Sequence, residues 1–572
     1  MRGCRASDWL EASLRALARP YPWSASASDG LERALDFLGA GIEPEVVVRA
    51  GYGLGMIGAS ITLLLWGALD LGYAGLLAAI ALVLLAVHVV HVAPRTLALA
   101  RRTRALGSAP DLVARAVLSM RLSPSPERAA AFAAESGDGP LTGSMAGHVW
   151  RARATGADAL ETFAREWEEW YPGLGRALEL VSAAGEMDGH DRERTLERAL
   201  SVVLEGTRSQ MRSFATRINR PVTALYAFGV LLPTALVALL PAASAAGVGV
   251  TTLTVIVVYD LLLPLGIVGA SIWLVVRRPV AFPPPHVDRS HPDVPDRTAV
   301  VLGIGLAAGV VAWIAAAACL PSWAGPFAAV GIGSGTVLWL HFRPVVAVYG
   351  RIRELEAGLT DALALVGRRV ANGVAVESAI EAAAADVDGA MGDVLDRAVT
   401  RQRQLSVGVT EAFLGDYGAL SDLPSPRARG SMAVLGLAAQ EGAPAGAALL
   451  ALADHVDELH RIERDSRQDL ESVLGTLHGT GALFGPMVAG ATVALADGIA
   501  SGSTLPGGGQ SLPWLGVAVG GYVLAFAVVL SALATSLARG FDRPLVGHRV
   551  GRALVCATVV YLASYLLVAG VA

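Results

Sequence analysis

The chain has 572 residues, 53% hydrophobic and 17% charged, with a net charge of −5 at pH 7. Soluble domains usually contain about 25% charged residues, and here charge-free stretches alternate with two densely charged ones. Every basic residue is arginine, which excludes a phosphate-binding loop ending in Gly-Lys-Ser/Thr and any Schiff-base lysine. The acidic balance argues against nucleic acid as a partner, and three widely separated cysteines argue against a disulfide framework or a zinc ribbon.

The first 49 residues carry charges throughout and lack the apolar core of a signal peptide, so we expect 1–49 to be a cytoplasmic N-terminal segment. Its amphipathic stretch 9–18 suits a membrane surface or a docking partner. A spanning helix needs about 20 apolar residues. Stretches of that kind predict nine transmembrane helices, grouped as pair 1 (50–94), pair 2 (221–276), pair 3 (298–342), pair 4 (480–537) and a last helix (553–572).

Between these pairs lie polar segments. We expect helical bundles in 95–220 and 343–479, a Pro- and His-rich linker in 277–297 and an arginine-rich loop in 538–552, all of them cytoplasmic. The two bundles, each flanked by pairs of spans about 250 residues apart, indicate a duplicated layout. The expected fold class is therefore an all-α integral membrane protein with about nine transmembrane helices and two cytoplasmic helical-bundle domains.

The polar segments have the periodicity of helices. Leu359, Leu363 and Val366 recur as one apolar stripe, and Asn372-Gly373 predicts a helix end. Val376 should open the next helix.

Arginine placement predicts the orientation. With both polar segments inside, the loops near Asp70, 241–247, 319–323 and 500–511 are outside, and none of them contains arginine. The positive-inside rule therefore places the N-terminus in the cytoplasm and the C-terminus outside, in a multi-pass protein of the cell membrane.

The stretch 359–384, with its glycine turn at Gly373, resembles the start of a type II secretion system F domain. A later turn of that family, Gly-Glu-x-x-Gly, is matched by Gly185, Glu186 and Gly189 in the first polar segment. In the second it is matched by Glu441 and Gly442, where Gln440 replaces the first glycine. The first segment has LSPSP where a counterpart of Gly373 is expected.

From about residue 50 onward, the chain resembles the archaeal-type platform proteins of type IV pilus and archaellum machines, which are similar to Tad-type platforms. The resemblance implies a scaffold without enzymatic activity, cofactor or metal. It also implies a cytoplasmic hexameric ATPase and membrane-embedded prepilins (pilin subunits) as partners. Small-residue runs such as 303–318 favour close helix packing in the bilayer and are compatible with a homodimer.

Several acidic residues are candidate sites. Asp260 is the one acid well inside an expected span, so it is either a functional group, for instance for a pilin amine, or a helix-packing residue. Glu166, Glu168 and Glu169 interleave with aromatic residues and form either a partner surface or a solvated face. Glu186 and Glu441 are expected to bond backbone N–H groups at a helix start.

Two other functions are compatible with a polytopic chain. A secondary transporter built from two repeats should show broken helices or paired polar residues at matching places in both halves. An intramembrane enzyme should show HExxH, GxSxG or paired aspartates within spans, and the sequence has none of these.

Overall fold

A computed structural model of the chain describes residues 3–69, 72–137, 139–245, 251–279, 287, 291–295, 297–441, 445–502 and 513–570. All regular secondary structure in these residues is helical, which confirms the all-α prediction. The α-helices are α1 (Gly3–Ala18), α2 (Asp29–Leu38), α3 (Pro44–Leu69), α4 (Gly72–Leu106), α5 (Ala109–Leu122), α6 (Pro126–Glu135), α7 (Pro140–Thr155), α8 (Ala159–Glu168), α9 (Pro172–Ala183), α10 (Gly189–Tyr226), α11 (Leu232–Ala245), α12 (Thr252–Ile256), α13 (Leu263–Val276), α14 (Thr298–Cys319), α15 (Ala324–Ala371), α16 (Val376–Asp386), α17 (Gly389–Leu405), α18 (Val409–Leu414), α19 (Pro426–Glu441), α20 (Ala445–Gly479), α21 (Gly485–Gly502), α22 (Pro513–Arg539) and α23 (Arg543–Ala569).

Four short segments have other helical geometries. One is the 3-10 turn η1 (Ala184–Glu186), and three are π-helical turns, η2 (Ala227–Leu231), η3 (Val257–Leu262) and η4 (Thr480–Phe484). Each π-helical turn joins two α-helices into one longer helix.

Eight helices within the described residues are long and apolar enough to cross a membrane, as expected of a multi-pass membrane protein. They are Pro44–Ala68, Gly75–Leu122, Gly189–Leu240, Thr252–Val276, Thr298–Cys319, Ala445–Ile499, Trp514–Arg539 and Arg543–Ala569. The ninth expected span, the second in 298–342, is not among these eight. It forms the first part of α15, where glycine, serine, threonine and histidine dilute the apolar side chains.

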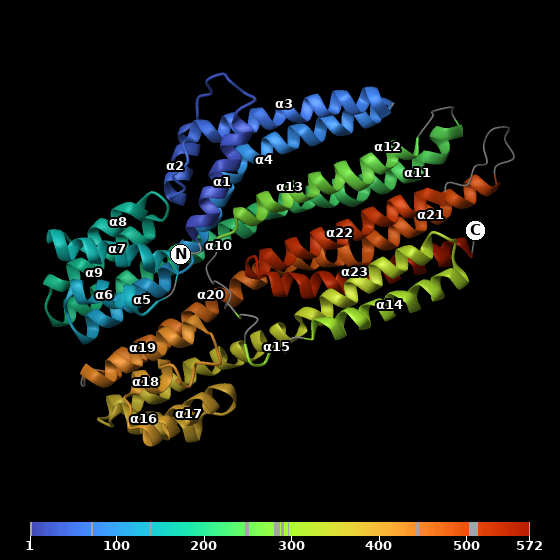
Figure 1. The fold of residues 1–572 in the computed structure, drawn as a ribbon. Helices are drawn as coiled ribbons and strands as arrows, with labels where there is room; N and C mark the ends of the chain where they lie inside the picture. The colour runs from blue at the N-terminus through green and yellow to red at the C-terminus, as the bar shows by residue number, and fades with distance from the viewer. Residues whose placement is uncertain are drawn as a thin grey trace.

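Figure 1 shows the apolar helices side by side, with the shorter polar helices gathered at one end. The first helix begins near that end and α23 finishes at the opposite end. One buried apolar cluster joins the membrane helices and includes Phe327, Phe526 and Tyr561. The α3–α4 hairpin lies at the edge of this group, and few of its side chains are buried.

The polar helices form two bundles. The first bundle comprises α5 to α9 and the polar part of α10, around a core that includes Phe163, Leu174 and Leu178. The second bundle comprises the polar part of α15, α16 to α19 and the polar part of α20, around a core that includes Phe413 and Leu449. The two cores share helices, because Leu118 of α5 joins the second core and Leu459 of α20 joins the first.

The helix end predicted at Asn372-Gly373 is confirmed. Helix α15 ends at Ala371, Gly373 has φ 87°, and α16 begins at Val376. Leu359, Leu363 and Val366 are all buried in the second core, as the apolar stripe predicted.

The N-terminal segment packs within the protein. Helix α1 crosses α3 at Gly53, where a side chain would meet the carbonyl oxygen of Leu17. Helix α2 reaches the first bundle, because Phe37 packs edge-on against Trp167 with ring centroids 6.1 Å apart.

Candidate functional site

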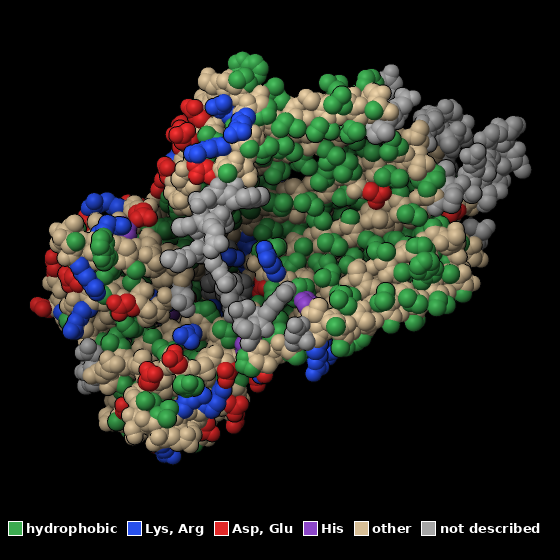
Figure 2. All heavy atoms as spheres, in the orientation of Figure 1, with side chains coloured by type: hydrophobic (Ala, Val, Ile, Leu, Met, Phe, Trp, Pro, Cys, Tyr) green, Lys and Arg blue, Asp and Glu red, His purple; other side chains and the backbone are tan. Residues whose placement is uncertain are grey.

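Asp260 lies in the π-helical turn η3, midway along a membrane-spanning helix. Its side chain is exposed, and one carboxylate oxygen lies beside α22, 2.7 Å from where a methyl group on Gly521 would stand. Within the described residues, its carboxylate forms no hydrogen bond or ion pair. The membrane-helix surface is largely hydrophobic, with a few acidic atoms among the green side chains of Figure 2. The acid therefore faces the bilayer or a partner inside it.

The three π-helical turns have a common local cause. A proline follows each of them by two residues, at Pro233, Pro264 and Pro486. Proline has no backbone N–H and its ring clashes with the carbonyl four residues earlier. Inserting one residue into the turn relieves that clash while the helix continues, and such π-bulges are frequent at functional sites. The carbonyl freed by Pro264 belongs to Asp260 itself.

The neighbouring helix α22 provides a hydrogen-bond donor to one of these freed carbonyl groups. The Tyr522 hydroxyl donates a hydrogen bond to the carbonyl oxygen of Gly229, which lies four residues before Pro233. Beside it, the Tyr259 hydroxyl donates to the carbonyl oxygen of Pro233 at 2.6 Å, and the two tyrosine rings meet edge to face at 5.9 Å. Backbone groups inside a bilayer need such partners, because no water is available to bond them.

The ring of Phe526 on α22 lies close to Gly229 of η2 and to Gly485, the residue directly after η4. A small apolar cavity of about 20 Å³ lies among η2, η3, α21 and α22. It has room for little more than one water molecule. The arrangement is therefore a packed joint between three bent helices, with one exposed carboxylate at its edge. That carboxylate can accept hydrogen bonds from a protonated amine or another donor on a neighbouring helix.

The three predicted acidic surface residues have different surroundings. Glu166 accepts a hydrogen bond from the buried side chain of His148 at 2.6 Å. Glu169 lies 3.7 Å from Arg33 of α2, with both side chains 64% exposed. Glu168 is exposed. Two of the three therefore contact groups of the same chain, and no pattern in the sequence indicated His148 as a partner.

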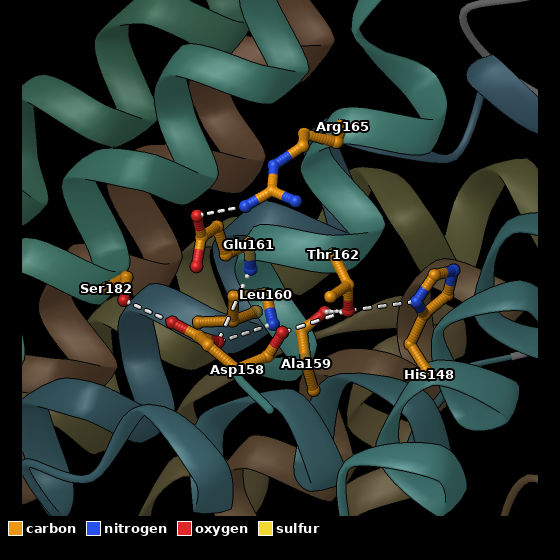
Figure 3. Close-up of polar contacts among 8 residues, drawn as sticks. All are labelled: His148, Asp158, Ala159, Leu160, Glu161, Thr162, Arg165 and Ser182. Atoms are coloured by element: carbon orange, nitrogen blue, oxygen red, sulfur yellow. Dashed lines mark hydrogen bonds and ion pairs between the residues drawn. The ribbon is translucent and has the colours of Figure 1, made fainter. Parts of the chain in front are cut away.

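Polar contacts fix the start of α8, which carries these acids (Figure 3). Asp158 caps the helix, accepting from the backbone N–H of Leu160 at 2.8 Å, and its second oxygen accepts the hydroxyl of Ser182 at 2.7 Å. His148 contacts Thr162, one turn further along, at 3.0 Å. Because capping satisfies orphan N–H groups, these contacts hold α7, α8 and α9 together.

The family-motif residues of the first bundle lie at the turn before α10. Gly185 and Glu186 belong to η1, and Gly189 begins α10 with φ 37°. A side chain at Gly185 would meet the ring of Pro126 at 2.6 Å, so glycine permits the close approach of α6. Within the described residues, the Glu186 carboxylate has no hydrogen bond to the start of α10.

In the second bundle, Gly373 forms the turn between α15 and α16. Glu441 is the last residue of α19, four positions before α20 begins, rather than a residue in the first turn of a helix. Gly442 lies outside the described residues. Among the described residues, these motif positions form turns in both bundles and do not form a reactive site.

Within the part of the chain that the structure describes, no group of three or more His, Cys, Asp or Glu side chains could hold a metal ion. Comparison of the chain with protein-family models, with curated proteins and with solved structures gives no match.

Proposed function

We propose that this protein is the membrane platform of a type IV pilus-like or type II secretion-like machine. In this role it couples a cytoplasmic hexameric ATPase to the extraction of pilins and their assembly into a filament. The observation that carries the proposal is the continuity of its helices. The helical runs Gly75–Leu122, Gly189–Leu240 and Ala445–Ile499, and α15, each extend from the apolar region into a polar bundle without a flexible linker. A force applied to a bundle would therefore reach the membrane helices directly.

The order of helices supports a duplicated layout. Five helices of the first bundle and five of the second follow one another with similar spacing. Their first residues are 126 and 376, 140 and 389, 159 and 409, 172 and 426, and 189 and 445. The last helix of each set then enters the apolar region and contains a π-helical turn, beginning at residue 227 or 480. Two bundles give an ATPase two similar attachment points.

The charge of the polar segments supports a role for both bundles in the cytoplasm. Residues 95–220 have 18 arginines and 16 acids, and residues 343–471 have 13 arginines and 20 acids. This arginine content favours the cytoplasmic side for both bundles and for the N-terminus. The first part of α15 would be the ninth span, because it is free of charges and packs between α14 and α23. The opposite charge balances suit different surfaces of one partner.

Asp260 supports a pilin contact within the bilayer. An exposed carboxylate on an apolar surface has a high cost in hydrocarbon unless a donor binds it. A protonated N-terminal amine on a neighbouring transmembrane helix is such a donor. Docking beside Gly521 would keep that helix close to η3.

Site-specific crosslinking in native membranes tests the proposal. A photoreactive phenylalanine analogue replaces Trp150 or Tyr417, which are 72% and 81% exposed on the first and second bundle. It also replaces Ile256, an exposed residue one turn from Asp260. We expect a hexameric ATPase from the bundle positions and a pilin from Ile256, with Trp313 on α14 as the membrane control. If none of the three positions yields either partner while the protein is at its native level, the proposal is wrong.

A secondary transporter is the second candidate, and one observation favours it. Bent helices at matching places in two halves are expected of transporters, and η2 and η4 occupy such places. Proteoliposomes containing the purified chain, with an ion gradient imposed, distinguish the two functions. Gradient-driven solute uptake that Asp260→Asn abolishes would favour the transporter, whereas a platform should show none.

A further inference from the structure

A cavity of about 120 Å³ lies where the membrane helices meet both polar bundles. Its walls come from α5, α15, α19, α20, α22 and α23 and from the residues just after α13. Figure 2 shows arginine atoms in the hollow between the bundles and the apolar helices. The cavity is several times larger than the roughly 10–15 Å³ of free space that one water molecule requires.

Arg278, two residues after the end of α13, is the most deeply buried charge on the cavity wall, with 4% of its surface exposed. Its Nε donates to the carbonyl oxygen of Leu537 at 2.6 Å, and Nη2 donates to that of Ala538 at 3.2 Å. Its Nη1 is buried and has no hydrogen-bond partner within the described residues. Burial, followed by the nearby charge of Arg467, lowers the pKa of Arg278 to about 10, so the guanidinium stays charged at neutral pH.

Three of the four carboxylates on the cavity wall have partners, and the fourth, Asp111, forms no ion pair within the described residues. Glu463 is paired with Arg467 and lies 3.6 Å from Arg427, which is equally close to Glu356. Asp542 interacts with the hydroxyl of Tyr349, and burial together with this carboxylate raises the pKa of that tyrosine. The acids therefore leave the deepest arginine unpaired.

Two further arginines on the wall have no ion pair within the described residues. Arg539 ends α22 and lies near the like charges of Arg353, Arg467 and Arg549, which the single nearby carboxylate of Glu463 offsets only in part. Arg353 extends from α15 and donates only to the carbonyl oxygen of Tyr349 in its own helix, at 3.2 Å. A half-buried cluster of like charges is unfavourable unless an anion binds between them.

We infer that this cavity binds a phosphate group, held by Arg278, Arg353 and Arg539. Guanidinium groups that come from three different segments of the chain suit an anion with several acceptor oxygens, and arginine binds phosphate through charge-assisted hydrogen bonds. The free Nη1 of Arg278 supplies a donor at the base of the cavity. The cavity lies at the level where apolar helices give way to polar ones, so the phosphate has two sources, the headgroup of an anionic lipid or a soluble phosphate.

A bound phosphate would add a further link between segments that lie far apart in the sequence. Arg278 follows the span α13, Arg539 ends the span α22, and Arg353 lies on the long helix of the second bundle. Occupancy would draw these three elements together and stiffen the junction between the membrane helices and the second bundle.

Binding experiments use the full chain with three variants. Arg539→Gln removes a cavity arginine that forms no hydrogen bond with any of the described residues, and Arg278→Gln removes the buried one. Arg277→Gln is the matched control, because Arg277 is the preceding residue, is exposed and stacks on Trp273 at 4.0 Å. In the first arm, delipidated protein in detergent is titrated with inorganic phosphate by calorimetry at constant ionic strength. In the second arm, nanodiscs of phosphatidylcholine with or without phosphatidic acid are compared by native mass spectrometry.

We expect Arg539→Gln to weaken binding in one of the arms by about tenfold or more, as the loss of a hydrogen bond to a charged group should, and Arg277→Gln to leave it unchanged. An effect in the first arm identifies a soluble phosphate, and an effect in the second identifies a lipid headgroup. If Arg278→Gln does not fold, Arg539→Gln still decides the result. The inference is overturned if neither probe binds, or if the control variant weakens binding as much as Arg539→Gln does.

Discussion

The membrane helices are joined in two different ways. Where α15 crosses α23 and α14, glycines bring the backbones together: Gly335 faces Gly551, and Gly333 faces Gly309. Where the bent helices meet α22, tyrosines reach across to backbone carbonyls instead. The glycine contacts depend on shape alone, whereas the Tyr522 hydroxyl replaces the hydrogen bond to the Gly229 carbonyl that Pro233 has removed. Regular helices can therefore pack tightly with no polar groups, and irregular ones need a donor from a neighbour.

The largest effect is expected at the glycine crossing. A methyl group on Gly551 would stand 2.5 Å from the backbone nitrogen of Trp339, so α15 and α23 must separate. We expect Gly551→Ala to lower the free energy of unfolding by about 3 kcal/mol. Gly303→Ala on α14 is the control, because nothing lies within 4 Å of the added methyl group. There we expect a rise of up to about 1 kcal/mol from helix propensity. Titration with SDS in mixed micelles, followed by circular dichroism, measures both.

A smaller loss is expected at the tyrosine joint. Tyr522→Phe removes the donor to the Gly229 carbonyl and leaves a buried acceptor unsatisfied, which should cost about 1–3 kcal/mol in the same assay. Tyr226→Phe is the matched control, since that side chain is 37% exposed. Equal stability of Tyr522→Phe and wild type would show that the carbonyl finds another partner and that the joint is held by packing alone.

A double-mutant cycle tests whether Pro233 is the reason that the Gly229 carbonyl needs Tyr522 as a donor. Pro233→Ala restores an N–H that can bond the Gly229 carbonyl within the helix. In that background, Tyr522→Phe should be less costly, with a coupling energy of about 1 kcal/mol. If the effects of the two substitutions are additive, the Tyr522 hydrogen bond does not depend on Pro233, and the π-helical turn needs another explanation.

The smallest effect on stability is expected at Asp260. Its carboxylate has no partner within the described residues, so Asp260→Asn should change the free energy of unfolding by less than about 0.5 kcal/mol. Crosslinking of a pilin from Ile256 should nevertheless be lost. A large loss of stability would instead assign the acid to packing within the chain.

The sequence was sufficient to predict features that depend only on residues close together in the chain. The helix end at Gly373 and the buried stripe of Leu359 and Leu363 follow from local backbone preference and periodicity. The proline four residues after Asp260 was visible too, but its consequence was not. The π-helical turn at Asp260 lies against Gly521 and Tyr522 of α22, which are more than 260 residues away in the chain.

The arginine cavity could not be predicted from the sequence, for the same reason. Arg278 predicted only the end of a span, because its carbonyl partners Leu537 and Ala538 lie about 260 residues further on. The ninth expected span falls below the criterion of hydropathy that the other eight meet, since charge-free sequence is not the same as apolar sequence when glycine and polar residues are frequent.

The prolines also fix the direction in which each bundle faces around the axis of the helix that carries it. One residue of an α-helix corresponds to about 100° around its axis, so the extra residue in η2 turns everything on the bundle side of α10 by that angle relative to its outer end. The turn in η4 does the same for α20. Because a proline holds each turn in place, both bundles keep a fixed facing direction. Straightening either helix would swing its bundle face by more than a quarter of a revolution without moving the helix along its axis.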